Sequence, residues 1–165
     1  MTEWRPGRRL ALHCALAAAL LATMAAAALS AGHPRLTVVG PDGERSYDIA
    51  ELRAMGEAEI TTGTPWTDGV QRFTGVTLAQ LLGDTAPEGG TLRLIALNDY
   101  ESQMPVDAVD PDAPIIAYWR DGNPMSIRDK GPFWVVFPFD SGTQFQSEQM
   151  FSRSVWQLVR IVIEP

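Results

Sequence analysis

The sequence predicts one α+β domain, rich in β-sheet, that follows a leader segment. Past the leader, short runs of apolar and β-branched residues alternate with clusters of Gly, Pro, Asn and Asp, the pattern of strands joined by turns. Only two segments have the caps and the spacing of short helices. About 130 residues follow the leader, which is enough for one domain with its own core.

The N-terminus has the parts of a secretory signal peptide. Three arginines among the first nine residues form a positive segment, residues 10–29 are almost uninterrupted Ala and Leu, and small residues follow. We therefore predict a signal peptide over 1–31, export to the periplasm, and a mature domain over 32–165. The apolar run is long enough to span a bilayer, so an uncleaved anchor is the alternative, although Ala gains little from insertion.

Charge and cysteine content exclude several function classes. The net charge is −7, and loss of Glu3 with the three leader arginines removes +2, which leaves −9 on the mature domain. This excess of acid argues against nucleic acid as a partner. Cys14 lies in the leader and His33 stands alone at the start of the domain, so we predict no metal site and no catalytic residue.

Caps and turns place the elements of the first half of the domain. Asp48 with Glu51 three residues later forms a capping box, and Thr77 can cap a second helix. The expected helices span 49–55 and 78–82. The expected strands span 36–39, 47–49, 59–62 and 72–74.

Alternation of apolar and polar residues identifies the strands of the second half. The nearly continuous apolar run at 133–137 suits a central strand buried on both faces. The polar, Gln-rich segment 140–152 is typical of a long surface loop. The expected strands span 91–97, 100–106, 115–119, 133–137 and 155–163.

Four clusters are candidate parts of a ligand site, and each also has a purely structural explanation. Trp66, in a loop of threonines and glycines, can stack on a flat ring or plug the edge of the core. Arg128 and Lys130 can hold an anion or a carbonyl, or lie in a solvated turn. Asp99 can accept from an amidine-like edge or cap its own turn, and Arg153 can clamp a ligand or join a cation–π pair.

The order of these segments resembles the sulfite-oxidase-type molybdopterin-binding domain. Residues 73–82, for example, are similar to that family's pattern W/F-x-G-V-x-L-x-x-L-L. The resemblance covers most of the mature chain and implies a β-rich mixed fold around a pterin pocket. The similar segments span 73–82, 98–105, 118–125, 131–138 and 156–163.

Two departures from the family pattern bear on mechanism. The family's enzymes bind molybdenum through a cysteine in the loop before the first of these segments, where this chain has only threonines. Phe133-Trp134 stands where the family has an arginine. A hydroxyl is a far poorer ligand than thiolate for such a metal, and lost phosphate-binding cations remove hydrogen bonds worth ~1.5–3 kcal/mol each.

A branch of periplasmic, cysteine-less proteins within this family is more similar still. It shares T-T-x-T-P-W-T-D-G, N-D-Y, R-D-K-G-P-x-W and S-R-x-V-W-Q-L, found here at 61–69, 98–100, 128–134 and 152–158. Members of that branch are thought to bind a free pterin and to report it to a membrane-bound partner, such as a cyclic-di-GMP enzyme or a sensor kinase.

The resemblance therefore implies a non-catalytic, periplasmic protein that binds a pterin without metal and signals to a membrane partner. Two alternatives stay open: a molybdopterin-dependent oxidoreductase of the sulfite-oxidase type, and an interaction module that kept the fold and lost the pocket. We expect Trp66 and Trp134 to stack on the ring, and Asp99 to accept hydrogen bonds from its 2-amino and N3 edge. The full set of expected pterin contacts is Thr62, Trp66, Thr67, Asp99, Tyr100, Arg128, Lys130, Trp134 and Arg153.

Overall fold

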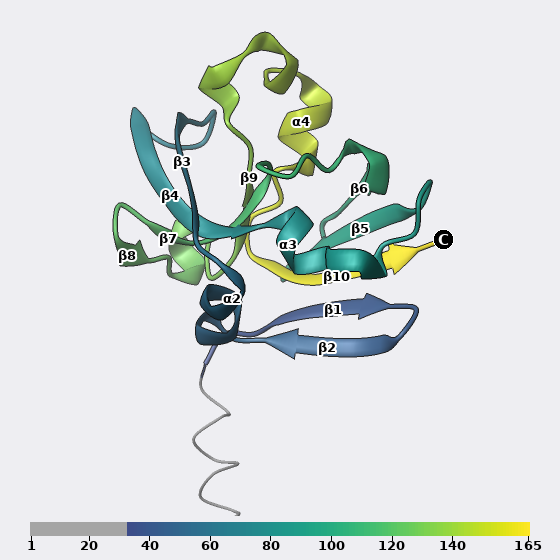
Figure 1. The fold of residues 1–165 in the computed structure, drawn as a ribbon. Coiled ribbons are helices and arrows are strands. Elements are labelled where there is room, and N and C mark those ends of the chain that lie inside the picture. The colour runs from purple at the N-terminus through teal and green to yellow at the C-terminus, as the bar shows by residue number, and fades with distance from the viewer. Residues whose placement is uncertain (1–32) are drawn as a thin grey trace, which may run out of the picture. The chain divides into compact units, whose positions relative to one another are not determined.

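The computed structural model describes residues 33–165, and Figure 1 shows them as two sheets with short helices between and around the strands. The predicted signal peptide and Cys14 lie outside this range. The first sheet has the spatial order β2 (Gly43–Tyr47), β1 (Leu36–Gly40), β10 (Leu158–Glu164), β5 (Thr91–Ala96) and β6 (Glu101–Pro105). Within it β1 and β10 run parallel, and the other neighbours are antiparallel.

The second sheet is antiparallel and is centred on β7 (Ile115–Arg120). One edge of β7 pairs with β4 (Val70–Thr77), which in turn pairs with β3 (Ala58–Gly63). The other edge pairs first with β9 (Trp134–Val136) and then with β8 (Asn123–Pro124). The short helices are α2 (Ile49–Met55), α3 (Leu78–Leu82), α4 (Glu148–Arg153), η1 (Gly83–Thr85), η2 (Val106–Ala108), η3 (Ile127–Asp129), η4 (Phe139–Ser141) and η5 (Thr143–Phe145).

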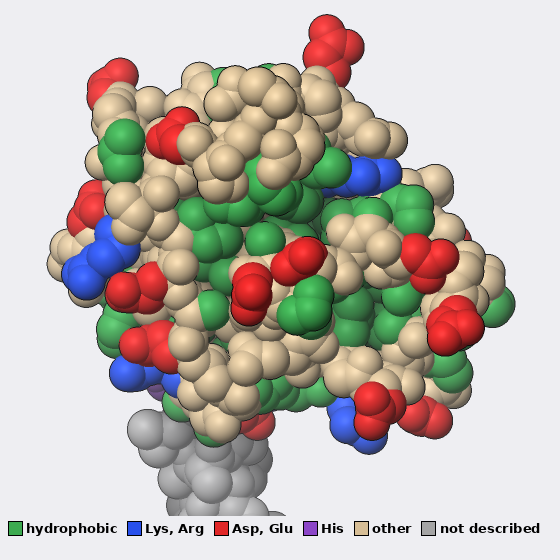
Figure 2. Space-filling view, turned by 45° about the horizontal axis from the view of Figure 1, so that its top comes forward, with side chains coloured by type: hydrophobic (Ala, Val, Ile, Leu, Met, Phe, Trp, Pro, Cys, Tyr) green, Lys and Arg blue, Asp and Glu red, His purple; other side chains and the backbone are tan. Residues whose placement is uncertain are grey.

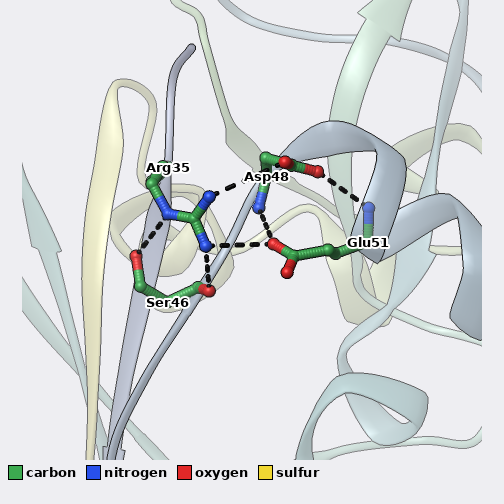
Figure 3. Close-up of polar contacts among 4 residues, drawn as sticks. All are labelled: Arg35, Ser46, Asp48 and Glu51. Carbon is green, nitrogen blue, oxygen red and sulfur yellow. Dashed lines mark hydrogen bonds and ion pairs between the residues drawn. The ribbon is translucent and has the colours of Figure 1, made fainter. Parts of the chain in front are cut away.

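The predicted capping box at α2 is confirmed. The Asp48 carboxylate accepts from the backbone N–H of Glu51 at 2.9 Å, and the Glu51 carboxylate accepts from the N–H of Asp48 at 2.7 Å (Figure 3). The Arg35 guanidinium also donates to Glu51, at 3.0 Å, and to the Ser46 hydroxyl at 3.1 Å. One cluster therefore joins the start of the domain, the end of β2 and the first turn of α2.

The core is divided between two groups of buried side chains. The larger group lies between the sheets and includes Leu36, Leu94 and Val135, and the smaller one includes Phe73 and Trp134. Trp66, in the loop between β3 and β4, packs against both groups. The loop that carries Trp66 is therefore fixed by the core.

Gly75 allows the two central strands to approach closely. The register between β4 and β7 shifts between Thr74 and Gly75, which is the mark of a β-bulge. A Cβ atom at Gly75 would overlap the carbonyl of Ile116 on β7. The close approach of β7 therefore explains why the family-like segment 73–82 has glycine at position 75.

The prediction of a loop over 140–152 is wrong in its second half. Ser147 accepts from the N–H of Met150 at 3.3 Å and begins α4, which is preceded by η4 and η5. The expected strand at 133–137 is also shorter, since only Trp134–Val136 pair with β7.

Acidic side chains outnumber basic ones in the domain, as its net charge requires. On the face in Figure 2, hydrophobic side chains are exposed in a central hollow and Asp and Glu side chains lie around it. Over residues 33–165, no helix is long and apolar enough to cross a membrane.

Candidate functional site

An aromatic cavity of about 320 Å³ lies where the β3–β4 loop, the β5–β6 turn and the end of α4 meet. Its walls come from segments far apart in the sequence, so it exists only in the folded domain. We call it the aromatic cavity, and its lining residues are Trp66, Ala96, Asn98, Tyr100, Phe151, Ser152, Ser154, Val155 and Trp156.

The aromatic walls are held in fixed orientations by edge-to-face packing. The ring centroid of Trp66 lies 5.1 Å from that of Trp156 and 6.0 Å from that of Phe151, with interplanar angles of 73° and 86°. Trp134 supports Trp66 at 6.1 Å. Edge-to-face pairs of this kind add about 0.5–1.5 kcal/mol each beyond area burial. The cavity is therefore preorganised for a flat apolar surface.

The polar atoms of the cavity are largely engaged within the protein. The buried Ser154 hydroxyl donates to the carbonyl of Val135 at 2.6 Å and accepts from the indole N–H of Trp134 at 3.1 Å. The Tyr100 hydroxyl donates to the carbonyl of Ser152 at 3.0 Å. None of the lining side chains is charged. The interior of the cavity is therefore neutral.

The predicted basic residues lie in different places around this cavity. Lys130, which follows η3 in the left-handed conformation at φ 72°, places its Nζ 5.3 Å from the ring centroid of Trp156. That geometry is a cation–π contact with a cavity wall. Arg128 is exposed on η3, and the neighbouring Asp129 carboxylate accepts from the Ser126 hydroxyl at 2.6 Å.

Arg153 is the most buried cation of the described range, with 7% of its surface exposed. Its Nε donates to the carbonyl of Gln103 at 3.2 Å and so holds α4 against the edge strand β6. Burial lowers the pKa of its guanidinium from the ordinary value. Arg153 is not a lining residue, whereas Ser152 and Ser154 on either side of it are.

Three other predicted contacts lie in the core or at a second cavity. Thr62 is fully buried, and its hydroxyl accepts from the N–H of Asp140 at 3.1 Å. Trp134 is also fully buried, so it has no face open to a ligand in this structure. Thr67 lies 2.8 Å, hydroxyl to hydroxyl, from Thr64, and both line a more open groove of about 510 Å³ beside the Trp66 loop.

The structure therefore brings together only part of the predicted set. Trp66 and Tyr100 face the aromatic cavity. Asp99 lies at the exposed tip of the β5–β6 turn, with φ 63°, and does not line it. Phe151 and Trp156 line the cavity and were missed: Phe151 falls in the segment predicted as a loop, whereas Trp156 lies in a family-like segment that could have identified it.

A thiolate-bound metal does not fit the side chains of this domain. Within residues 33–165, no three His, Cys, Asp or Glu side chains are placed to hold a metal ion. The hydroxyl of Thr62, near the end of β3, is engaged with the N–H of Asp140. Phosphate recognition would need cations, and the aromatic cavity has none among its lining residues.

The fold is the sulfite-oxidase-like molybdopterin-binding fold, an α+β architecture rich in β-sheet, which confirms the predicted fold class. Among solved structures, the chain is similar to the sulfane dehydrogenase SoxCD from Paracoccus pantotrophus, with a TM-score of 0.59 and 18% sequence identity. The match covers 79% of this chain and 38% of that one, so this chain spans well under half of its neighbour's length. No family model and no curated protein match the sequence.

Proposed function

We propose that this protein is exported and binds a free pterin in the aromatic cavity, without catalysing a reaction, and that it reports the bound pterin to a membrane partner. The observation that carries the proposal is the cavity itself. It joins four aromatic walls to a neutral interior, and its volume of about 320 Å³ is at the small end of ligand pockets. The aromatic walls are Trp66, Tyr100, Phe151 and Trp156.

A bicyclic ring suits these walls better than a larger cofactor does. Stacking on Trp66 or Trp156 gains area burial together with the electrostatic preference of aromatic pairs. Lys130, beside Trp156, is placed to meet a carbonyl or a hydroxylated side chain at the edge of the ring. A molybdopterin would also bring a phosphate and a metal, for which the lining residues supply neither cations nor a thiolate.

An oxidoreductase is the second candidate, and the observation that favours it is the fold. The similar solved structure is named a dehydrogenase. However, one fold can host unrelated functions, and function depends on the residues of the site. The donor set described above does not fit the metal, so the binding function is the better supported of the two.

Tryptophan fluorescence tests the proposal directly. Protein purified from cells that express the full chain should bind tetrahydropterins with a saturable fluorescence change, since two cavity walls are indoles. Trp66→Phe should remove most of that change. Trp119→Phe is the matched control and should keep it, because Trp119 packs under Arg53 and does not line the cavity.

Two outcomes would count against this function. Absence of binding up to high micromolar pterin would reject the pterin proposal. Molybdenum at about one atom per chain in the same native preparation would favour the oxidoreductase.

A further inference from the structure

We propose that Asn98 selects the ligand by donating a hydrogen bond from its side-chain amide to a carbonyl oxygen of the bound ring. The aromatic cavity would then prefer an uncharged 4-oxo heterocycle over the same ring with a 4-amino group. This inference rests on the proposed function and adds to it a specificity-determining residue and a ligand class.

The turn between β5 and β6 fixes the orientation of the Asn98 amide. Its Oδ1 accepts from the backbone N–H of Tyr100 at 3.3 Å, which is an Asx turn. Two backbone hydrogen bonds close the turn. The N–H of Ala96 donates to the carbonyl of Tyr100 at 2.9 Å, and the N–H of Asp99 donates to the carbonyl of Ala96 at 3.1 Å. Because Oδ1 is engaged, Nδ2 is the free end of the amide, and Asn98 lines the cavity.

The other lining side chains have few protons left to donate. The Ser152 hydroxyl donates to the carbonyl of Gln149 at 2.8 Å, and the hydroxyls of Ser154 and Tyr100 donate to backbone carbonyls. These oxygens keep lone pairs, so they can only accept from a ligand. The lining donors that remain are the indole N–H groups of the walls and the Asn98 amide.

The lining residues carry no charge, although Lys130 contacts the Trp156 wall, so the interior of the cavity favours an uncharged ring. A carboxylate or phosphate placed inside would lie beside indoles and hydroxyls with no lining cation, and an unpaired charge in such surroundings is costly. An uncharged ring that presents a carbonyl acceptor and N–H donors matches what the cavity offers: the amide of Asn98 for the carbonyl, and hydroxyl oxygens for the N–H groups.

Two pteridines that differ only in the group at position 4 test this inference. Wild-type protein should bind 2-amino-4-oxopteridine about tenfold more tightly than 2,4-diaminopteridine, a modest factor because Asn98 is exposed to water on one side. Asn98→Asp keeps the oxygen that caps the turn and exchanges the amide donor for an acceptor. In that variant the preference should reverse.

Two further variants keep the test decisive. Asn98→Ser retains an oxygen for the turn but loses the amide, so it should bind both rings with similar affinity. Asn123→Asp makes the same exchange at an exposed residue of β8 that does not line the cavity, and it should keep the wild-type preference.

The outcomes separate this inference from the function on which it rests. If wild-type protein binds neither of these rings nor a tetrahydropterin, the proposed function fails, and if it binds only the tetrahydropterin, this inference alone is rejected. If it binds the 4-oxo ring and neither Asn98 variant alters the preference, only the role of Asn98 is rejected.

Discussion

Thr62 joins the loop that carries Trp66 to the segment that follows β9. Its hydroxyl accepts from the N–H of Asp140 and donates to the carbonyl of Gly63, both at 3.1 Å. The Asp140 carboxylate returns a contact by accepting from the N–H of Gly63 at 2.6 Å. A hydroxyl engaged on both sides within the core has a structural role, and it acts on the ligand only through the position of Trp66.

Replacing Thr62 by Val should therefore lower stability and spare binding. Val has nearly the same shape, so the main change is the loss of the hydrogen bond from the Asp140 N–H, which costs about 0.5–1.5 kcal/mol of unfolding free energy. Urea unfolding measures that loss, and Thr62→Ser should recover most of it. Lost pterin affinity in a variant of unchanged stability would contradict this role and restore Thr62 as a ligand contact.

At the scale of elements, the β5–β6 turn is linked to the end of α4 across the aromatic cavity. The hydrogen bond from the Tyr100 hydroxyl to the Ser152 carbonyl joins two lining residues. Arg153, the last residue of α4, separately donates to the carbonyl of Gln103 on β6. Because this contact already anchors α4, the Tyr100 hydroxyl can hold the cavity closed without being needed to keep the helix in place.

Removal of this hydroxyl should open the cavity even when no ligand is present. Tyr100→Phe keeps the ring and loses the hydrogen bond, so a neutral quencher such as acrylamide should reach Trp66 and Trp156 more readily. The slope of the quenching plot should rise. Tyr118→Phe is the matched control, because its hydroxyl contacts Glu57 at 3.4 Å, away from the cavity, and it should quench as wild type does. Equal slopes for Tyr100→Phe and wild type would rule out this closing role.

At the scale of the whole molecule, the predictable parts are those encoded locally. The caps at Asp48 and Thr77 fix both predicted helices, since a side chain and its neighbours three residues away suffice to form them. Strands were predictable where apolar residues alternate. Helix α4 was missed because its segment is polar and Gln-rich, and its position depends on long-range contacts, from Arg153 to β6 and from Tyr100 to Ser152.

The candidate site was less predictable, since burial of an aromatic residue is decided by tertiary packing. Trp66 stands in a polar, turn-rich loop, whereas Trp134 lies in the apolar run 133–137. In the fold, Trp134 enters β9 and is fully buried, as that run predicts, and Trp66 is half-buried and lines the cavity. No local pattern shows that Trp66 faces a cavity, because its walls come from segments far apart in the sequence.

The surface around the cavity suggests where a signalling partner would bind. The side chains of Leu97 and Ile127 are exposed to 51% and 54%. Both residues are hydrogen-bonded to Gln157: the N–H of Leu97 donates to the Gln157 carbonyl at 2.9 Å, and the Gln157 Nε2 donates to the Ile127 carbonyl at 2.7 Å. Tyr100, exposed to 46%, belongs to the same turn as Leu97 and lines the cavity. Exposed apolar side chains next to a ligand site are typical of a protein interface.

We therefore expect Ile127→Asp to abolish the proposed signalling without weakening pterin binding. A charge in an apolar contact disfavours docking of the partner. Pterin binding should persist because residue 127 does not line the cavity. With a cyclic-di-GMP enzyme as the partner, the measurement is the pterin-dependent change in cellular cyclic-di-GMP. Met55→Asp places the same charge at an exposed apolar residue on α2 and should leave that response intact. A full response from the Ile127 variant would show that the partner binds another face of the domain. A lost response from both variants would show that any added charge on this acidic domain prevents docking.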